Sequence, residues 1–124
     1  MPKKKILIVD DEVSITKLLK YALERSERYE VRCENEGAGI FPAIRSFSPD
    51  LIILDVNLPD AQGGDISASL QEDPALRNIP VIFLTGMISQ EEAKSGLTIA
   101  GRPAVSKPVN FEVLVQCIES HLPK

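Results

Sequence analysis

The chain has 124 residues, of which 44% are hydrophobic and 26% charged, and this is the composition of a conventional globular domain with its own core. A formal net charge of −4 gives no reason to expect a broad basic surface for nucleic acid, and no apolar run approaches the roughly 20 residues that span a bilayer. Two cysteines and one histidine are too few for a disulfide framework or a zinc cluster. We therefore expect a cytoplasmic protein with reduced thiols that binds neither nucleic acid directly nor a membrane.

In chain order, short aliphatic runs alternate with patterns typical of amphipathic helices. The first half predicts a strand at Lys5–Val9, a helix with one apolar face, a strand at Glu30–Cys33, a second such helix, and a strand at Leu51–Leu54. The second half predicts a helix at Gly64–Glu72, a strand at Val81–Leu84, a helix at Ser89–Ile99, a strand at Ala104–Ser106, and a final helix. The apolar faces are those of Ile15, Leu18, Leu19, Ala22 and Leu23 in the first helix, Ile40, Ala43, Ile44 and Phe47 in the second, and Phe111, Leu114, Val115, Ile118 and Leu122 in the last.

Two residues bear on the ends and the strength of these helices. Gly96 lies inside the fourth predicted helix and weakens it by about 1 kcal/mol relative to alanine. Asn110 directly precedes the last helix, where its side chain can accept a hydrogen bond from a free backbone N–H group.

The strands are continuous apolar runs rather than alternations with polar residues, which is typical of a parallel sheet covered on both faces. Five strands alternating with five helices predict an α/β domain with right-handed crossovers. In such sheets ligands bind beyond the carboxyl ends of the strands. Every predicted strand except the second ends in a polar group of this kind, and the groups are Asp10 with Asp11, Asp55, Thr85 and Lys107. We therefore expect one site at this edge of the sheet.

Three carboxylates in one site repel each other, because a pair at ~4 Å in an effective dielectric near 20 costs about 4 kcal/mol. A divalent cation reverses the sign of that energy, and oxygen ligands without nitrogen favour Mg²⁺. A metal ion, an ammonium group and a hydroxyl group together can stabilise a phosphoryl group while a carboxylate attacks it. Aspartate is a competent nucleophile for forming an acyl phosphate.

The segments "ILIVDDE", "LIILDVNLPD", "FLTG" and "SKPV" together resemble the receiver domain of two-component response regulators, of the chemotaxis-regulator type. The resemblance extends over residues 1–124 and implies a single receiver domain. It implies a doubly wound, flavodoxin-like α/β fold with a five-stranded parallel sheet of order 2-1-3-4-5 and helices on both faces. It also implies a phosphoacceptor in a phosphorelay that catalyses only its own phosphorylation and dephosphorylation, and so is not an enzyme in the usual sense.

The resemblance assigns roles to the residues at the strand ends. Asp55 would be the phosphoacceptor, and Asp10 and Asp11 would bind Mg²⁺ together with Asp55. Asn57, two residues past the acceptor, would contribute its backbone carbonyl oxygen to the metal.

Further roles follow for the segments around the acceptor. Thr85 would donate its hydroxyl group to the phosphoryl group, and Lys107 would pair with the phosphoryl oxygens. The Lys107–Pro108 bond matches the cis peptide of the family, since cis is accessible to X–Pro bonds. Pro59 and Gly63 match the loop after the acceptor, where glycine permits a close backbone approach.

The sequence departs from the family pattern at the last predicted strand. Receivers usually carry an aromatic residue three positions before the lysine, and here that position is Ala104. No aromatic residue lies between Phe83 and Phe111, which predicts no nearby substitute. The stretch before the lysine also matches one residue fewer than usual, and Pro103 would tolerate its missing N–H at a sheet edge. We expect output to use backbone rearrangement of the loop after the fourth strand and of the helix at Ser89–Ile99.

Three functions compete at this point. A signalling switch would take its phosphoryl group from a sensor histidine kinase or a histidine phosphotransfer protein. A degenerate receiver would only dock partners, which Ala104 alone favours. A haloacid-dehalogenase-like phosphatase also uses an aspartate nucleophile, but it needs a second acid at the position of Asn57, and an amide cannot protonate a leaving group.

For the switch, we expect a downstream protein to bind the face formed by the fourth helix, the fifth strand and the fifth helix. We expect a monomer or a weak dimer that depends on phosphorylation.

Overall fold

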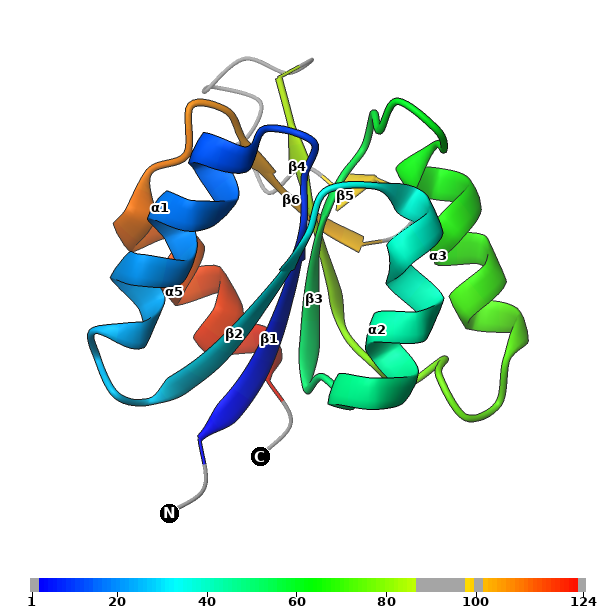
Figure 1. Ribbon diagram of the computed structural model, residues 1–124, viewed down its shortest axis with the longest axis horizontal. Helices are drawn as coiled ribbons and strands as arrows, with labels where there is room; N and C mark the ends of the chain where they lie inside the picture. The colour runs from blue at the N-terminus through cyan, green and yellow to red at the C-terminus, as the bar shows by residue number, and fades with distance from the viewer. Residues whose placement is uncertain (1–2, 87–97, 100–101, 123–124) are drawn as a thin grey trace.

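The computed structural model describes residues 3–86, 98–99 and 102–122, and within them strands and helices alternate along the chain (Figure 1). The helices coincide, to within a residue or two, with the segments in which apolar residues recur with the period of an α-helix. The strands are β1 (Lys4–Val9), β2 (Tyr29–Glu34), β3 (Leu51–Asp55), β4 (Val81–Thr85), β5 (Thr98–Ile99) and β6 (Arg102–Ser106). The helices are α1 (Val13–Glu24), the short 3-10 helix η1 (Gly37–Gly39), α2 (Ile40–Phe47), α3 (Gly63–Glu72) and α5 (Phe111–His121).

Five of the strands form a parallel sheet in the spatial order β2-β1-β3-β4-β6. This confirms the predicted α/β doubly wound, flavodoxin-like fold with strand order 2-1-3-4-5. β1 lies between β2 and β3 and pairs with both, so that Ile6 lies opposite Val31 of β2 and Leu51 of β3. All five residues of β3 and of β4 are buried, as their continuous apolar sequences predict.

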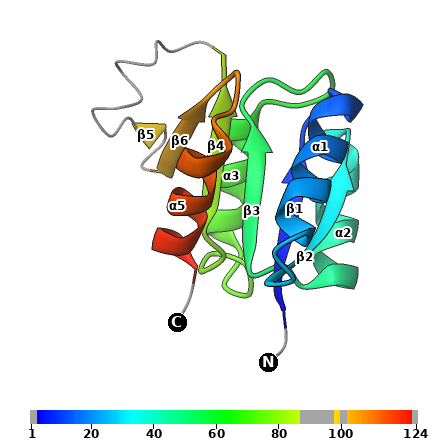
Figure 2. The same ribbon diagram turned by 90° about the vertical axis from the view of Figure 1, so that its left-hand side faces the viewer.

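Helices cover both faces of the sheet, with α1 and α5 on one face and α2 and α3 on the other (Figures 1 and 2). The first face encloses a core to which α1 contributes Leu19 and Leu23, and α5 contributes Leu114 and Ile118. The second face encloses a separate core around the fully buried Phe83, with buried side chains from α2 and α3. Neighbouring side chains along β1, β3 and β4 therefore enter different cores. In β2 only Tyr29 and Val31 are buried, so the sheet is fully covered on both faces at its centre but not at this edge.

The last part of the sheet differs from the prediction. The helix expected at Ser89–Ile99 is wrong at its end, because Thr98 and Ile99 form β5, which pairs antiparallel with Arg102 and Pro103 of β6 (Figure 2). Pro103 therefore does not lie on the outermost strand. The rest of that predicted helix, with Gly96, lies outside the described residues.

Two smaller predictions concern helix ends and faces. Asn110 caps α5, since its side-chain oxygen accepts a hydrogen bond from the backbone N–H of Val113 at 3.2 Å. Leu18 was expected in the core, but its residue is 66% exposed. Among the described residues no helix combines the length and the apolar character that crossing a membrane requires.

Candidate functional site

Polar side chains from four strands meet at the carboxyl edge of the sheet. Asp10 directly follows β1, Asp55 and Thr85 end β3 and β4, and Lys107 directly follows β6. These strands are neighbours in one parallel sheet, so their carboxyl ends lie side by side. The residues that the sequence assigned to one site are therefore brought together.

The three carboxylates of the site lie close enough to share one cation. Asp10, Asp11 and Asp55 each offer an oxygen atom, and these atoms all lie within 4.8 Å of one another. Asp10 is fully buried and Asp55 is 5% exposed, whereas Asp11 is exposed to solvent. Ionised groups at this spacing and burial repel each other unless a positive charge lies between them.

Lys107 supplies a positive charge to this group. Its Nζ lies 2.8 Å from Asp10 Oδ2 and 3.1 Å from Asp55 Oδ2, and its side chain is only 17% exposed. The buried Asp10 Oδ2 is contacted by this ammonium group as an ion pair, and it has no further hydrogen-bond donor among the described residues. A buried carboxylate oxygen in that state fits a metal ligand, and the all-oxygen set around it suits Mg²⁺.

The environment shifts the pKa values of both partners. Burial raises the pKa of Asp55 above its ordinary value, and the nearby charge of Asp10 raises it further, against hydrogen bonds from the Asn57 N–H group and Lys107. Burial alone would lower the pKa of Lys107, but the carboxylates of Asp10 and Asp55 outweigh it and raise that pKa. Lys107 is therefore held in its charged form, while burial makes the ionised form of Asp55 less favourable than it is in water.

The loop after β3 holds the second oxygen of the acceptor. The backbone N–H of Asn57 donates to Asp55 Oδ1 at 3.1 Å, and the N–H of Gly63 donates to the carbonyl of Val56 at 2.7 Å. A Cβ atom added to Gly63 would lie 2.6 Å from the carbonyl oxygen of Asp55, a distance that side chains do not tolerate. This confirms that the backbone approaches closely at Gly63, as its place in the sequence predicts.

Thr85 and Lys107 lie next to each other at the ends of β4 and β6. Thr85 is 2% exposed, and its carbonyl oxygen accepts a hydrogen bond from the N–H of Lys107 at 2.9 Å. The Lys107–Pro108 peptide bond is cis, as predicted. The hydroxyl group of Thr85 thus comes from the strand next to the one that carries Asp55.

An aromatic ring lies on the strand next to Ala104, a neighbour that the sequence alone did not identify. Phe83 lies opposite Ala104 across the β4–β6 pair and is fully buried. Its ring lies on the face of the sheet that α3 covers, since Phe83 Cε1 would lie 3.2 Å from a Cβ atom added to Gly63. The aromatic group at this level of the sheet is contributed by β4 instead of β6.

Three polar residues near the site were given no role on the basis of the sequence. Glu12 Oε1 lies 3.8 Å from Lys107 Nζ, at the start of α1. Asn35 and Asp60 make hydrogen bonds between the loops at this edge of the sheet. The second strand was predicted to end without a functional group, yet Asn35 directly follows it. Its place one residue past the strand end was the signal that could have identified it.

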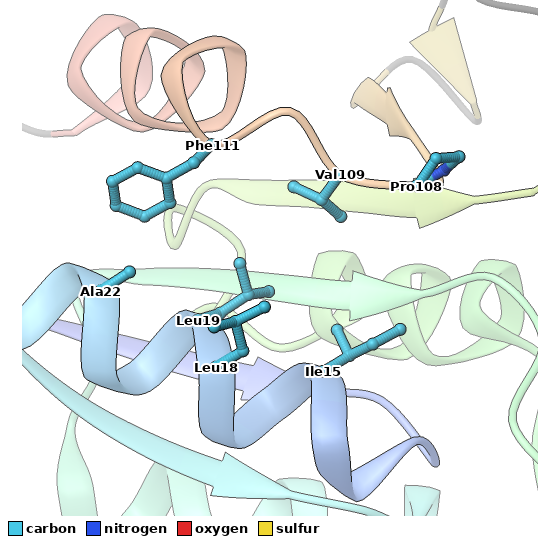
Figure 3. A pocket seen from close by; sticks show the side chains of 7 residues that line it. All are labelled: Ile15, Leu18, Leu19, Ala22, Pro108, Val109 and Phe111. Atoms are coloured by element: carbon cyan, nitrogen blue, oxygen red, sulfur yellow. The ribbon is translucent and has the colours of Figure 1, made fainter.

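An apolar groove opens beside the site, between α1 and the segment that leads into α5 (Figure 3). Leu18 and Phe111, which were predicted on the apolar faces of their helices, lie at this groove and are 66% and 37% exposed. Pro108, the residue after Lys107, also lines it. The lining residues are Ile15, Leu18, Leu19, Ala22, Pro108, Val109 and Phe111.

Comparisons with known proteins agree with this arrangement. The sequence matches the family described as response regulator receiver domain over residues 6–119. The polar-differentiation response regulator DivK of Brucella anthropi is 30% identical over 98% of this chain and 98% of its own length. The alkaline phosphatase synthesis transcriptional regulatory protein PhoP of Bacillus subtilis is 36% identical over 85% of this chain. The matching region spans only 42% of PhoP.

A solved structure gives the same result for the fold. The chemotaxis response regulator CheY4 of Vibrio cholerae superposes with a TM-score of 0.81 and 27% sequence identity, covering 98% of this chain and all of CheY4. The chain thus matches some relatives over their whole length, and others, such as PhoP and the mycobacterial regulator TcrX, over less than half of theirs.

Proposed function

The chain belongs to the response regulator receiver domain family, and from this premise we propose that Asp55 is its phosphoacceptor, in a reaction that depends on Mg²⁺. The observation that carries the proposal is the position of the Asp55 carboxylate, 3.1 Å from Lys107 Nζ and in one group with Asp10 and Asp11. Residues 1–124 would form one receiver domain. Receiver domains are in general signalling modules, so the phosphoryl group itself is the signal.

Four oxygen ligands are available for the metal ion. The carboxylates of Asp10, Asp11 and Asp55 and the backbone carbonyl of Asn57 would hold Mg²⁺, with water completing its coordination. When bound, the ion neutralises charge on the phosphoryl oxygens. Asp10 Oδ2 supports this assignment, because it is a buried carboxylate oxygen whose contact at 2.8 Å is an ion pair with the Lys107 ammonium group.

The chemistry at Asp55 is a transfer between two covalent partners. A carboxylate oxygen of Asp55 forms a bond to phosphorus while the phosphorus–nitrogen bond of a phosphohistidine breaks. The electron pair of that bond stays on the imidazole nitrogen, which takes a proton from solvent. The ammonium group of Lys107 and the hydroxyl group of Thr85 then donate hydrogen bonds to the phosphoryl oxygens, where preorganised donors stabilise negative charge.

We assign the donor, a sensor histidine kinase or a histidine phosphotransfer protein, to the apolar groove beside the site. Large exposed apolar side chains that gather in one place mark protein contact surfaces, and Leu18 and Phe111 are such side chains. The groove reaches the site through Pro108, so a protein seated in it has its histidine near Lys107. The downstream protein would bind the face formed by β6, α5 and residues 89–97. Of these, residues 89–97 lie outside the described part of the chain.

Intact mass after incubation with acetyl phosphate tests the chemistry. The wild type should gain one phosphoryl group only when Mg²⁺ is present, and Asp55→Asn should gain none. The matched control is Asp65→Asn, which removes an exposed aspartate in the first turn of α3 and should leave the gain unchanged. If the wild type gains no mass, the acceptor role is wrong and the chain acts as a docking module that is independent of phosphorylation.

Two exposed residues of α1 test the donor surface. Leu18 lines the groove, whereas Tyr21 is equally exposed, at 63%, and is not among the lining residues. Leu18→Asp should slow transfer from the histidine donor that is fastest with the wild type, and leave the reaction with acetyl phosphate unchanged. Tyr21→Asp should change neither. Equal transfer rates in both variants would exclude the groove as the donor surface.

A further inference from the structure

The segment between β2 and α2, residues 35–39, makes hydrogen bonds to two other loops of the site. Asn35 Nδ2 donates to the carbonyl oxygen of Asp10 at 2.8 Å and to Thr16 Oγ1 at 3.2 Å. The backbone N–H groups of Gly37 and Ala38 donate to the two carboxylate oxygens of Asp60 at 2.7 and 2.9 Å. One short segment thus contacts the loop after β1 and the loop after β3.

These two loops carry different parts of the proposed metal site. The loop after β1 carries Asp10 and Asp11, and the loop after β3 carries Asn57, three residues before Asp60. Among the described residues, the 35–39 segment is bonded to both of them through side chains. Its packing is also tight, since a Cβ atom on Gly37 would lie 2.8 Å from Ala61 Cβ. The segment can therefore set the spacing between the two loops.

That spacing matters most for a small cation. Mg²⁺ requires near-octahedral coordination at about 2.0–2.1 Å, so small displacements of its ligands weaken binding. Groups that orient ligands from outside typically contribute 10- to 100-fold to metal affinity. We propose that Asn35 and Asp60 are positioning residues for the metal site, acting through the 35–39 segment to hold the Asp10–Asp11 loop and the Asn57 loop in register. The proposal rests on the proposed Mg²⁺ site.

Binding of Mg²⁺ alone, measured by calorimetric titration without any phosphodonor, tests this. Asn35→Ala removes the donor to Asp10, and Asp60→Asn leaves only one of the two backbone N–H groups with an oxygen acceptor. Each variant should bind Mg²⁺ about 10-fold or more weakly than the wild type. Asp73→Asn is the matched control, because Asp73 is also exposed and accepts a backbone hydrogen bond, from Ala75 at 2.9 Å, in a loop at the other end of α3.

Two further measurements separate positioning from charge and from general stability. Repeating the titrations in about 1 M KCl, where the Debye length is about 3 Å, removes most of the long-range effect of the lost charge at Asp60. Because both residues act through one segment, the double variant should lose less affinity than the product of the two single losses. Melting temperatures without Mg²⁺ show whether each variant is folded, and affinities are compared only among folded variants.

The outcomes are distinct. Weaker binding in both variants, at low and high salt and less than multiplicative in the double variant, supports the proposal. Wild-type affinity in folded Asn35→Ala and Asp60→Asn overturns it, as does a fully multiplicative loss. If the wild type binds no Mg²⁺, the proposed metal site has failed and the positioning role fails with it.

Discussion

Replacing Gly63 by alanine should damage both stability and phosphorylation, although alanine is the better helix former. The new Cβ atom would lie 2.6 Å from the carbonyl oxygen of Asp55 and 3.0 Å from Val56 Cα, and both are backbone atoms that cannot rotate away. Overpacking of this kind costs about 1–3 kcal/mol, against a helix-propensity gain of about 0.5–1 kcal/mol. The free energy of unfolding should fall by about 1–2 kcal/mol, which lowers the melting temperature by about 4–8 °C.

Gly64 provides the control one residue later. It lies in the same turn of α3, and a Cβ atom there would meet nothing within 4 Å. Gly64→Ala should leave the melting temperature unchanged or raise it by up to about 4 °C, through a gain of up to about 1 kcal/mol.

Thermal melts without Mg²⁺ and initial rates with acetyl phosphate measure both effects. Gly63→Ala should also react more slowly than Gly64→Ala, because the clash displaces the acceptor and its loop. If the two variants melt at the same temperature and react at the same rate, the close approach at Gly63 does not position Asp55.

Three other perturbations have definite expected results. Lys107→Met leaves the buried Asp10 and Asp55 carboxylates without their cation, so the free energy of unfolding without Mg²⁺ should fall by up to about 3 kcal/mol. Saturating Mg²⁺ should restore much of the lost stability. Asp55→Asn should raise the melting temperature without Mg²⁺ at neutral pH, because the raised pKa of Asp55 means that its ionised form is disfavoured in the folded state. The difference in melting temperature should vanish at a pH below the ordinary carboxyl pKa, about 3.9. With saturating Mg²⁺ at neutral pH the difference should change sign. Asn110→Ala removes the cap of α5 and should lower the free energy of unfolding, measured with urea, by about 1 kcal/mol. The phosphorylation rate should not change.

The parts of the fold that the sequence predicts are those that leave a local pattern. Continuous apolar runs such as Leu51–Leu54 mark buried parallel strands, and the polar residue at the end of each run marks the edge where the site forms. β5 was missed because a strand of two residues, Thr98–Ile99, has no period. The exposure of Leu18 was missed because periodicity gives the apolar face of α1 but not how far along that face its neighbours extend.

The site was predicted less completely than the fold, and the reason is sequence distance. Asp55, Lys107 and the acidic pair lie at the ends of apolar runs, so they can be identified from the sequence. Asn35 and Asp60 act through hydrogen bonds to groups 25 and 23 residues away, at Asp10 and Gly37, in loops without a repeating pattern. The position of Asn35 just after β2 could have identified it as a residue of this edge, but its hydrogen-bond partners, and those of Asp60, depend on which strands and loops are neighbours in space.

The aromatic ring of Phe83 lies opposite Ala104, and this arrangement bears on how a change at the site can reach the surface of the protein. In this chain the aromatic ring stands on β4, two residues before Thr85 on the same face of that strand, and it is fully buried against the α3 side of the sheet. A ring enclosed by packed side chains has no open space to turn into, so a rotamer change that reaches the surface is not available to it. We therefore expect a movement of Thr85 toward a phosphoryl group to be passed on through the backbone of β4 rather than by this ring. This is the physical reason to look for the signal in backbone rearrangement rather than in a side-chain switch.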